Sequence, residues 1–336
     1  MPTQQRFNII YNDNGQGLSR DARVVQEALR SAGFRTWLTA LSPRQFPRSL
    51  NYTPERALWT ARSATRRVVH AWARRARFWD VNIFIETIVP EYLASARVNC
   101  LVPNQEWLSP DDLASMRSVD IVLCKTAHAV QALSSHARAS AFIGFTSLDR
   151  SQPRVTRHVD AALHVAGWNP HKGTAAVIGA WLDNPAWPGL TVVAHREPLR
   201  SSRANIDLLT ARVPDRQLRR LQNACGVHVC PSEVEGFGHT LMEGMSCGAV
   251  VVTTAAPPMD ELVSPDEGFL VPYAAAKQMG SGTRYIVEKD RLADVLRHVW
   301  SLDGARLRSL GAAARARYEN GRAAFQRRLV DVVRGL

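Results

Sequence analysis

The sequence is poor in cysteine and contains no C-x-x-C pair. Its five cysteines stand mostly in apolar, strand-like stretches, at positions 100, 124, 225, 230 and 247. This pattern indicates reduced core residues and argues against a disulfide framework or a zinc ribbon. No apolar run reaches the roughly 18 residues of a membrane span, and the first residues lack the basic-then-apolar order of a signal peptide. We therefore expect a cytoplasmic protein.

The first glycine-rich turn lacks two parts of a dinucleotide-binding fingerprint. In "NGQGLSR", Gly15 and Gly17 separate a strand-like run from a helical one, but the third glycine position is Arg20. The following strand, "RTWLTALS", carries no acidic residue to hold a ribose. A nicotinamide cofactor is therefore not expected. Gly15, Gly17 and Leu18 form either a plain β-α turn or a loop whose backbone approaches a ligand closely, and both interpretations stay open.

Acidic residues are scarce in one segment that carries two thirds of the net charge of +12. Between Pro43 and Phe78 the chain has nine arginines, no lysine and one acidic residue. The stretch 56–77 fits an amphipathic helix, which predicts either peripheral binding to an anionic membrane surface or a core-packed helix with a solvated basic side. The charge also suggests a nucleic-acid-binding protein. Because the basic segment lacks interleaved aromatics at loop positions for base stacking, no nucleic acid partner is expected.

The order of apolar runs predicts an α/β protein with two domains. At 336 residues and 46% hydrophobic content, the chain exceeds one average domain. Short apolar runs alternate with helical patterns over 1–150 and again over 158–317, separated by a polar linker, which indicates two Rossmann-like, doubly wound domains. The last helix, about 318–336, is long enough to pack back on the first domain. Such folds bind ligands at the carboxyl ends of the strands, so we expect a cleft between the domains.

The stretch "PSEVEGFGHTLMEGMSCGAVVVTT", Pro231 to Thr254, has the features of an anion site. A strand ends before it, and Gly236 and Gly238 permit a turn into a helix that begins near His239. The N–H groups at such a helix start are donors that favour an anion. Glu235 stands before the helix and Glu243 inside its first turns, where a carboxylate can accept hydrogen bonds from vicinal hydroxyls. Helix-start acids alone would explain Glu235 but not the two glycines.

A second turn in the same domain supports this interpretation. "AGWNPHKGT" follows a strand and opens a helix, and it places Lys172 between Gly167 and Gly173. An ammonium and backbone N–H groups at such a turn can lie beside a diphosphate. A lysine next to a glycine is commonly a solvated surface residue, so the turn gains weight only together with the Pro231–Thr254 stretch.

These two motifs resemble the donor site of the retaining glycosyltransferases of family 4 and their relatives, which have the GT-B fold and an E-x7-E pattern, here Glu235 to Glu243. The resemblance implies transfer of a sugar from a nucleotide-diphosphate sugar with retained anomeric configuration. It implies that Glu243 holds the ribose hydroxyls, that Glu235 contacts the sugar and phosphates, and that Lys172 binds the diphosphate. Donor-binding positions implied in this way are Gly167, Trp168, Lys172, Gly236, Phe237, Gly238, His239, Thr240, Leu241 and Glu243, with Glu235 and Lys172 in catalytic roles.

One position departs from the family pattern. The family usually has an arginine directly after the strand glycine, and this chain has Trp168. Either another cation, such as Arg196 or Arg203, takes part, or the diphosphate is held less tightly. No Asp-x-Asp occurs in the sequence, so nothing indicates a metal-bridged diphosphate site. With Lys172 and a helix dipole to neutralise charge, we expect no metal and no cofactor.

The acceptor side is less clearly encoded. After a strand come four residues that form a polar and aromatic group, Asn104, Gln105, Glu106 and Trp107. This group either borders the acceptor or simply caps a β-α loop. A nucleotide-sugar 2-epimerase of the same fold is the enzymatic alternative, and it would need acid/base carboxylates, for which Glu86 and Glu106 are the candidates. The leading expectation is a cytoplasmic glycosyltransferase in glycan biosynthesis, peripheral to the inner face of the membrane if the Arg-rich helix 56–77 binds there. Its acceptor would be a glycan, a lipid-linked sugar or a small molecule.

Overall fold

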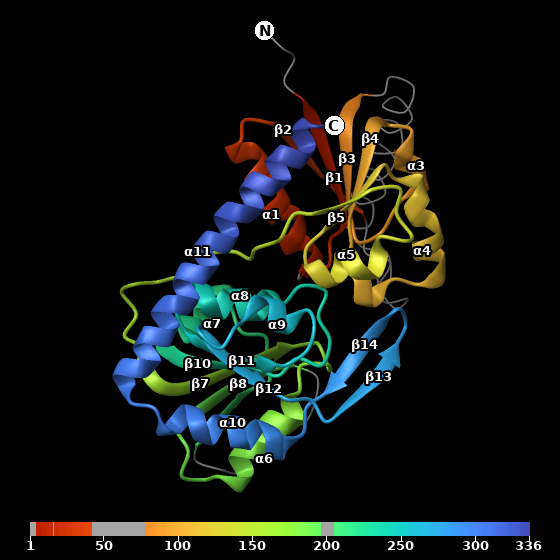
Figure 1. The fold of residues 1–336 in the computed structure, drawn as a ribbon. Coiled ribbons are helices and arrows are strands. Elements are labelled where there is room, and N and C mark those ends of the chain that lie inside the picture. The colour runs from red at the N-terminus through yellow and green to blue at the C-terminus, as the bar shows by residue number, and fades with distance from the viewer. Residues whose placement is uncertain (1–4, 16, 42–77, 196–204) are drawn as a thin grey trace, which may run out of the picture.

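The computed structural model describes residues 5–15, 17–41, 78–195 and 205–336. The Arg-rich segment 56–77 and the candidate cations Arg196 and Arg203 lie outside these residues. In the described part, two six-stranded parallel sheets are covered by helices, and they are stacked one above the other (Figure 1). The predicted α/β architecture of two Rossmann-like domains is confirmed.

The first sheet has the order β2-β1-β3-β4-β5-β6, and all neighbouring strands are parallel. Its strands are β1 Arg6–Asn12, β2 Arg35–Leu41, β3 Trp79–Ile85, β4 Ala96–Val102, β5 Ile121–Cys124 and β6 Ser140–Phe142. Its helices are α1 Gly17–Ser31, α3 Pro90–Leu93, α4 Pro110–Ser115 and α5 Ala127–Leu133, with 3-10 turns η1 Gln105–Trp107 and η2 Met116–Ser118. Helix α1 ends before Gly33, whose φ of +88° suits glycine and lets the chain turn into β2.

The second sheet has the order β12-β11-β10-β7-β8-β9 and is also parallel. Its strands are β7 His158–Gly167, β8 Leu190–Ala194, β9 Ile206–Leu209, β10 Cys225–Cys230, β11 Val250–Thr254 and β12 Gly268–Val271. Its helices are α6 Thr174–Asp183, α7 Asp215–Ala224, α8 His239–Ser246, α9 Met259–Leu262 and α10 Lys289–Ser301. The central strands are apolar on both faces, as expected for strands covered by helices on both sides.

The last helix, α11 Gly304–Arg334, runs along one side of both sheets (Figure 1). Its first half packs on α8 and its second half on α1. Tyr318 is fully buried, and its hydroxyl donates to the carbonyl of Ser147 at 2.8 Å. Phe325 packs edge-on against Phe145, 5.0 Å between ring centroids. One apolar core therefore continues from the first sheet into the second through α8 and α11. The domain limits 1–150 and 158–317 stay a prediction.

A β-hairpin outside both sheets was not predicted. β13 Ala275–Met279 pairs antiparallel with β14 Gly282–Ile286. Its tip lies against η1 of the first domain, where the Ser281 hydroxyl donates to the carbonyls of Gln105 and Leu108. At Gly282, a Cβ would come within 2.8 Å of the Glu106 Cα. The hairpin therefore joins the two halves of the molecule at the edge opposite α11 (Figure 1).

Candidate active site between the two sheets

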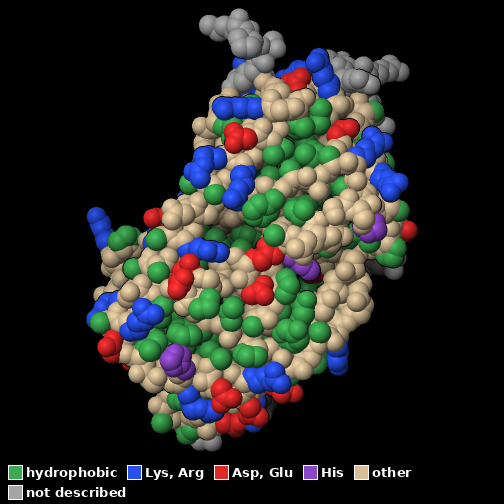
Figure 2. Space-filling view, in the orientation of Figure 1, with side chains coloured by type: hydrophobic (Ala, Val, Ile, Leu, Met, Phe, Trp, Pro, Cys, Tyr) green, Lys and Arg blue, Asp and Glu red, His purple; other side chains and the backbone are tan. Residues whose placement is uncertain are grey.

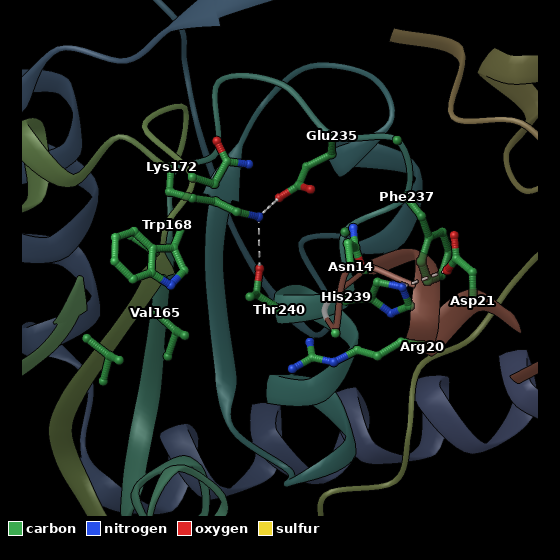
Figure 3. A pocket seen from close by; sticks show the side chains of 18 of the residues that line it. Asn14, Arg20, Asp21, Val165, Trp168, Lys172, Glu235, Phe237, His239 and Thr240 are labelled. Carbon is green, nitrogen blue, oxygen red and sulfur yellow. Dashed lines mark hydrogen bonds and ion pairs between the residues drawn. The ribbon is translucent and has the colours of Figure 1, made fainter. Parts of the chain in front are cut away.

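A cavity of about 650 Å³ lies between the two domains, and most of the predicted site residues line it (Figure 3). From the second domain come the predicted donor positions Gly167, Trp168, Lys172, Glu235, Gly236, Phe237, Gly238, His239 and Thr240, and from the first Gly15, Gly17 and Asn104. Leu18, Gln105, Glu106, Leu241 and Glu243 are not among the lining residues. The structure thus brings most of both motifs to one place.

The turn between β10 and α8 forms the floor of this cavity. Residues 231–238 are buried throughout, and Gly238 begins α8 with a φ of +115°, which disfavours any side chain. At Gly236 a Cβ would lie 2.4 Å from the Asn104 Oδ1 of the other domain, so only glycine permits this approach. His239 and Thr240 expose the start of α8 to the cavity. Leu241 is buried, and its N–H donates to the Gly238 carbonyl at 3.1 Å, so it is less available to an anion than the sequence suggested.

Lys172 and Glu235 face each other across the cavity wall and form an ion pair (Figure 3). Lys172 also approaches the Thr240 hydroxyl at 3.4 Å. The lysine is positioned by the turn at Gly173, whose φ is +69° and where a Cβ would meet the Pro231 carbonyl at 2.4 Å. The two predicted turns therefore pack directly on each other. This contact holds an ammonium and a carboxylate beside the start of α8.

Glu243 lies behind this wall, not on it. Its side chain is 2% exposed, its Oε2 accepts a 2.7 Å hydrogen bond from Gln222 Nε2, and its Oε1 lies 2.8 Å from Nη1 of Arg20. Arg20 belongs to α1 of the other domain and lines the cavity. The arginine therefore stands between Glu243 and the open part of the cavity.

The position where the family has an arginine is an exposed Trp168 that lines the cavity. Its ring lies 5.5 Å from that of His195. Gly167 before it has a φ of +58°. Three lysine or arginine residues that the sequence did not suggest also line the cavity within the described ranges, Arg20, Lys125 and Arg212. They add positive charge to a cavity in which the expected arginine is replaced.

The first domain contributes a buried polar network that the sequence did not indicate. Asp21 on α1 lies 2.5 Å from Lys125 Nζ and 2.7 Å from His239 Nε2, so it joins α1 to the connection after β5 and to the start of α8. Lys125 also donates to Asn104 at 2.7 Å, and Asn104 donates to Glu86 at 3.0 Å. Burial raises the pKa of Asp21, but Lys125 and His239 outweigh it, and the pKa lies below its usual value. The network ties the two domains together beside the cavity.

The predicted acceptor-side residues divide into two groups. Asn104 lines the cavity, whereas Gln105 and Glu106 are buried under the β13–β14 hairpin. Burial raises the pKa of Glu106 to about 8, and its Oε2 has no hydrogen-bond partner. Trp107, next in the chain, is exposed and lines the cavity, with its ring 6.2 Å from that of His171. Trp107 and Asn104 are therefore the parts of this loop that a ligand can reach.

Two further properties of the described residues bear on other kinds of site. No group of three or more His, Cys, Asp and Glu residues that could hold a metal ion occurs in the described ranges. Within the same ranges, no helix combines the length and the apolar character needed to cross a bilayer.

The two facing Rossmann-like domains have the GT-B fold, and a family match within the second domain supports a glycosyltransferase. Residues 203–299 match the family described as "Glycosyl transferases group 1", and the predicted resemblance to the family 4 glycosyltransferases and their relatives is confirmed. No curated protein sequence matches the chain.

Solved structures share the fold over the whole length. Sucrose-phosphate synthase from Thermosynechococcus elongatus is 17% identical with a TM-score of 0.69, and 99% of each chain is covered. HepE from Anabaena, in complex with UDP and glucose, is 14% identical with a TM-score of 0.68, over 99% of this chain and 100% of that one. A trehalose-6-phosphate protein from E. coli, bound with UDP-2-fluoro glucose, is 11% identical with a TM-score of 0.65, over 99% of both chains.

Proposed function

We propose that the protein transfers a sugar from a nucleotide-diphosphate sugar to a hydroxyl acceptor, with retained anomeric configuration and without a metal ion. The observation that carries the proposal is the meeting of Lys172, Glu235 and the start of α8 in one interdomain cavity. Similar folds have been solved with UDP and glucose and with UDP-2-fluoro glucose, which supports a nucleotide sugar as the donor. The acceptor is a glycan, a lipid-linked sugar or a small molecule.

In this proposal the diphosphate lies between Lys172 and the first N–H groups of α8. The bond between the sugar C1 and the phosphate oxygen breaks, and the acceptor oxygen bonds to C1 on the same face. The proton of the acceptor hydroxyl passes to the departing phosphate oxygen. The ammonium of Lys172 and the helix-start dipoles stabilise the charge that develops on that oxygen. Glu235, beside Lys172, contacts the sugar, and Asn104 and Trp107 border the acceptor.

The epimerase alternative is less well supported. Its two candidate carboxylates are Glu86 and Glu106, and neither lines the cavity. Glu86 accepts from Asn104, and burial raises its pKa. The nucleic-acid alternative gains no support from the face drawn in Figure 2, where Lys and Arg side chains are interspersed with acidic ones and do not gather in one patch.

Calorimetric titration with UDP, GDP and ADP, followed by turnover of the matching nucleotide glucose, tests the donor assignment. We expect one diphosphate to bind, its affinity to be unchanged by EDTA, and the product to have the donor's anomeric configuration by NMR. Failure of every nucleoside diphosphate to bind would remove the proposal. An inverted product would contradict retention alone.

A cytoplasmic location, with the Arg-rich segment 56–77 on the inner face of the membrane, is part of the same proposal. Vesicles containing acidic lipid should bind the protein at low salt, and binding should fall in the triple variant Arg66→Glu, Arg67→Glu, Arg74→Glu. Equal binding of the variant and the parent protein would show that this segment does not mediate membrane contact.

A further inference from the structure

The carboxylate proposed to hold the ribose is occupied in the structure by an arginine from the other domain. Glu243 on α8 is 2% exposed and Arg20 on α1 is 31% exposed, and their charged groups lie 2.8 Å apart. A buried carboxylate without a partner is costly, so Arg20 stabilises Glu243 in this state. The Oε1 of Glu243 forms this ion pair but accepts no hydrogen bond from the described residues, so it is the oxygen at which a ribose hydroxyl would compete with Arg20.

The second partner of Glu243, Gln222, is held too firmly to be displaced by a ligand. Gln222, which donates to Oε2 at 2.7 Å, is itself buried on α7 of the same domain, and its Oε1 accepts from Arg150 at 2.8 Å. Gln222 is therefore fixed from both ends. Arg20 is partly exposed, comes from the opposite domain and lines the cavity. It is the contact of Glu243 that can exchange with a ligand.

The cavity offers Arg20 a second position. Lys172 is paired with Glu235, Lys125 is paired with Asp21, and Trp168 stands where an arginine is expected. An incoming diphosphate carries negative charge that these paired lysines neutralise only in part, and Arg20 and Arg212 are the other described lysine or arginine residues that line the cavity. Figure 3 shows the guanidinium of Arg20 extending into the cavity on the side of Thr240 and away from Asp21. A change of side-chain rotamer would move it from the carboxylate to a phosphate without moving α1.

We propose that Arg20 exchanges partners when the donor binds: the ribose hydroxyls take its place on Glu243, and its guanidinium moves to the diphosphate in place of the arginine that Trp168 replaces. This inference rests on the proposed function. The exchange couples the two ends of the donor, because the nucleoside displaces Arg20 and the diphosphate stabilises it elsewhere. A nucleoside without phosphates must displace Arg20 from Glu243 but offers the guanidinium no new partner. Arg20 therefore makes the site selective for the nucleoside diphosphate.

The test compares the binding of uridine and of UDP to the whole protein by calorimetry, and uridine binding is measured by its displacement of UDP. If the protein binds GDP or ADP instead of UDP, that diphosphate and its own nucleoside are compared in the same way. In Arg20→Gln, the phosphate contact and the competitor for Glu243 are both lost. We expect weaker binding of UDP and equal or tighter binding of uridine. The ratio of the two dissociation constants, uridine over UDP, should fall at least about tenfold, or about 1.4 kcal/mol.

Arg23→Gln is the matched control, since Arg23 lies on the same helix, is exposed and does not line the cavity. It should leave the ratio unchanged, whereas Arg20→Lys should restore part of it because a point charge remains. If Arg20→Gln fails to fold, Arg20→Lys measured in the same way decides. An unchanged ratio, with both ligands weakened equally or not at all, would overturn the exchange alone. Absence of any nucleoside diphosphate binding to the parent protein would instead overturn the proposed function and the exchange together.

Discussion

The two walls of the cavity are built in different ways. The wall from the second domain comes from two short stretches, 167–173 and 231–243, in which each functional residue is a few positions from the next. The wall from the first domain gathers Asp21 from helix α1 and Asn104 and Lys125 from two separate connections that follow strands, and hydrogen bonds tie them together. The first arrangement is suited to gripping one ligand, and the second holds two domains at a set distance.

The largest expected effect tests whether the first-domain wall is structural. Lys125→Met removes one partner from a pair whose side chains are 0% and 3% exposed, and it leaves the Asp21 carboxylate buried with only His239. Breaking a buried pair from one side costs about 3–5 kcal/mol of unfolding free energy. Chemical denaturation measures it. Lys289→Met, which removes an exposed pair with Asp183, is the control and should change stability little. Equal effects of the two variants would show that the network does not hold the domains.

The next effect tests whether the second-domain wall is chemical. Glu235→Ala should lower kcat by about 10²-fold or more, because its contact with the sugar matters most in the transition state. Binding of the free nucleoside diphosphate should stay equal or become tighter, since Lys172 loses its carboxylate partner. Glu233→Ala is the matched control: Glu233 lies in the same turn but pairs with Arg284 of the hairpin. A similar loss of kcat in both variants would show that Glu235 supports the structure of the turn and does not act on the sugar.

The contrast between the walls also explains what could be predicted from sequence. Glycines, a lysine and two glutamates at short spacing pointed to the second-domain site, because helix starts and tight turns are local features. Asp21 and Lys125 gave no such signal, since their partners are distant in the chain and become neighbours only when the sheet forms. The pairing of Glu243 with Arg20 was missed for the same reason. The hairpin had a signal, Gly280-Ser281-Gly282 between two extended runs, which typically indicates a β-turn.

Lys172→Ala should produce a smaller effect, and it tests whether Lys172 binds the phosphates while other residues of the second-domain wall bind the nucleoside. The ammonium is proposed to meet only the phosphates, so the dissociation constant of UDP should rise about tenfold while that of uridine stays the same. Calorimetry on both ligands measures this. Lys277→Ala, an exposed lysine on the hairpin, should change neither. Equal weakening of both ligands would assign Lys172 to the turn and not to the diphosphate.

Last, pH should act on the two domains in opposite directions. In the second domain, burial lowers the pKa of His164 and of His228 to about 4. Both are neutral when folded but take up protons on unfolding, so their contribution to stability is lost as pH falls from about 6.5 toward 4. In the first domain, burial raises the pKa of Glu106 from 4.5 to about 8. The folded state then binds more protons than the unfolded state, and stability is lost as pH rises through that interval.

Glu106→Gln separates the two effects, because a neutral amide imitates the protonated carboxyl and cannot ionise. As pH rises from 4.5 to about 8, the unfolding free energy of the parent protein should fall relative to that of Glu106→Gln. The contribution of the two histidines cancels from this difference, since both proteins retain them. We rank this effect last because it rests on one group buried under the hairpin and develops gradually as pH rises. Denaturation curves at several pH values measure the difference, and parallel stability profiles for the two proteins would show that Glu106 ionises normally and that the first-domain wall is open to water at this point.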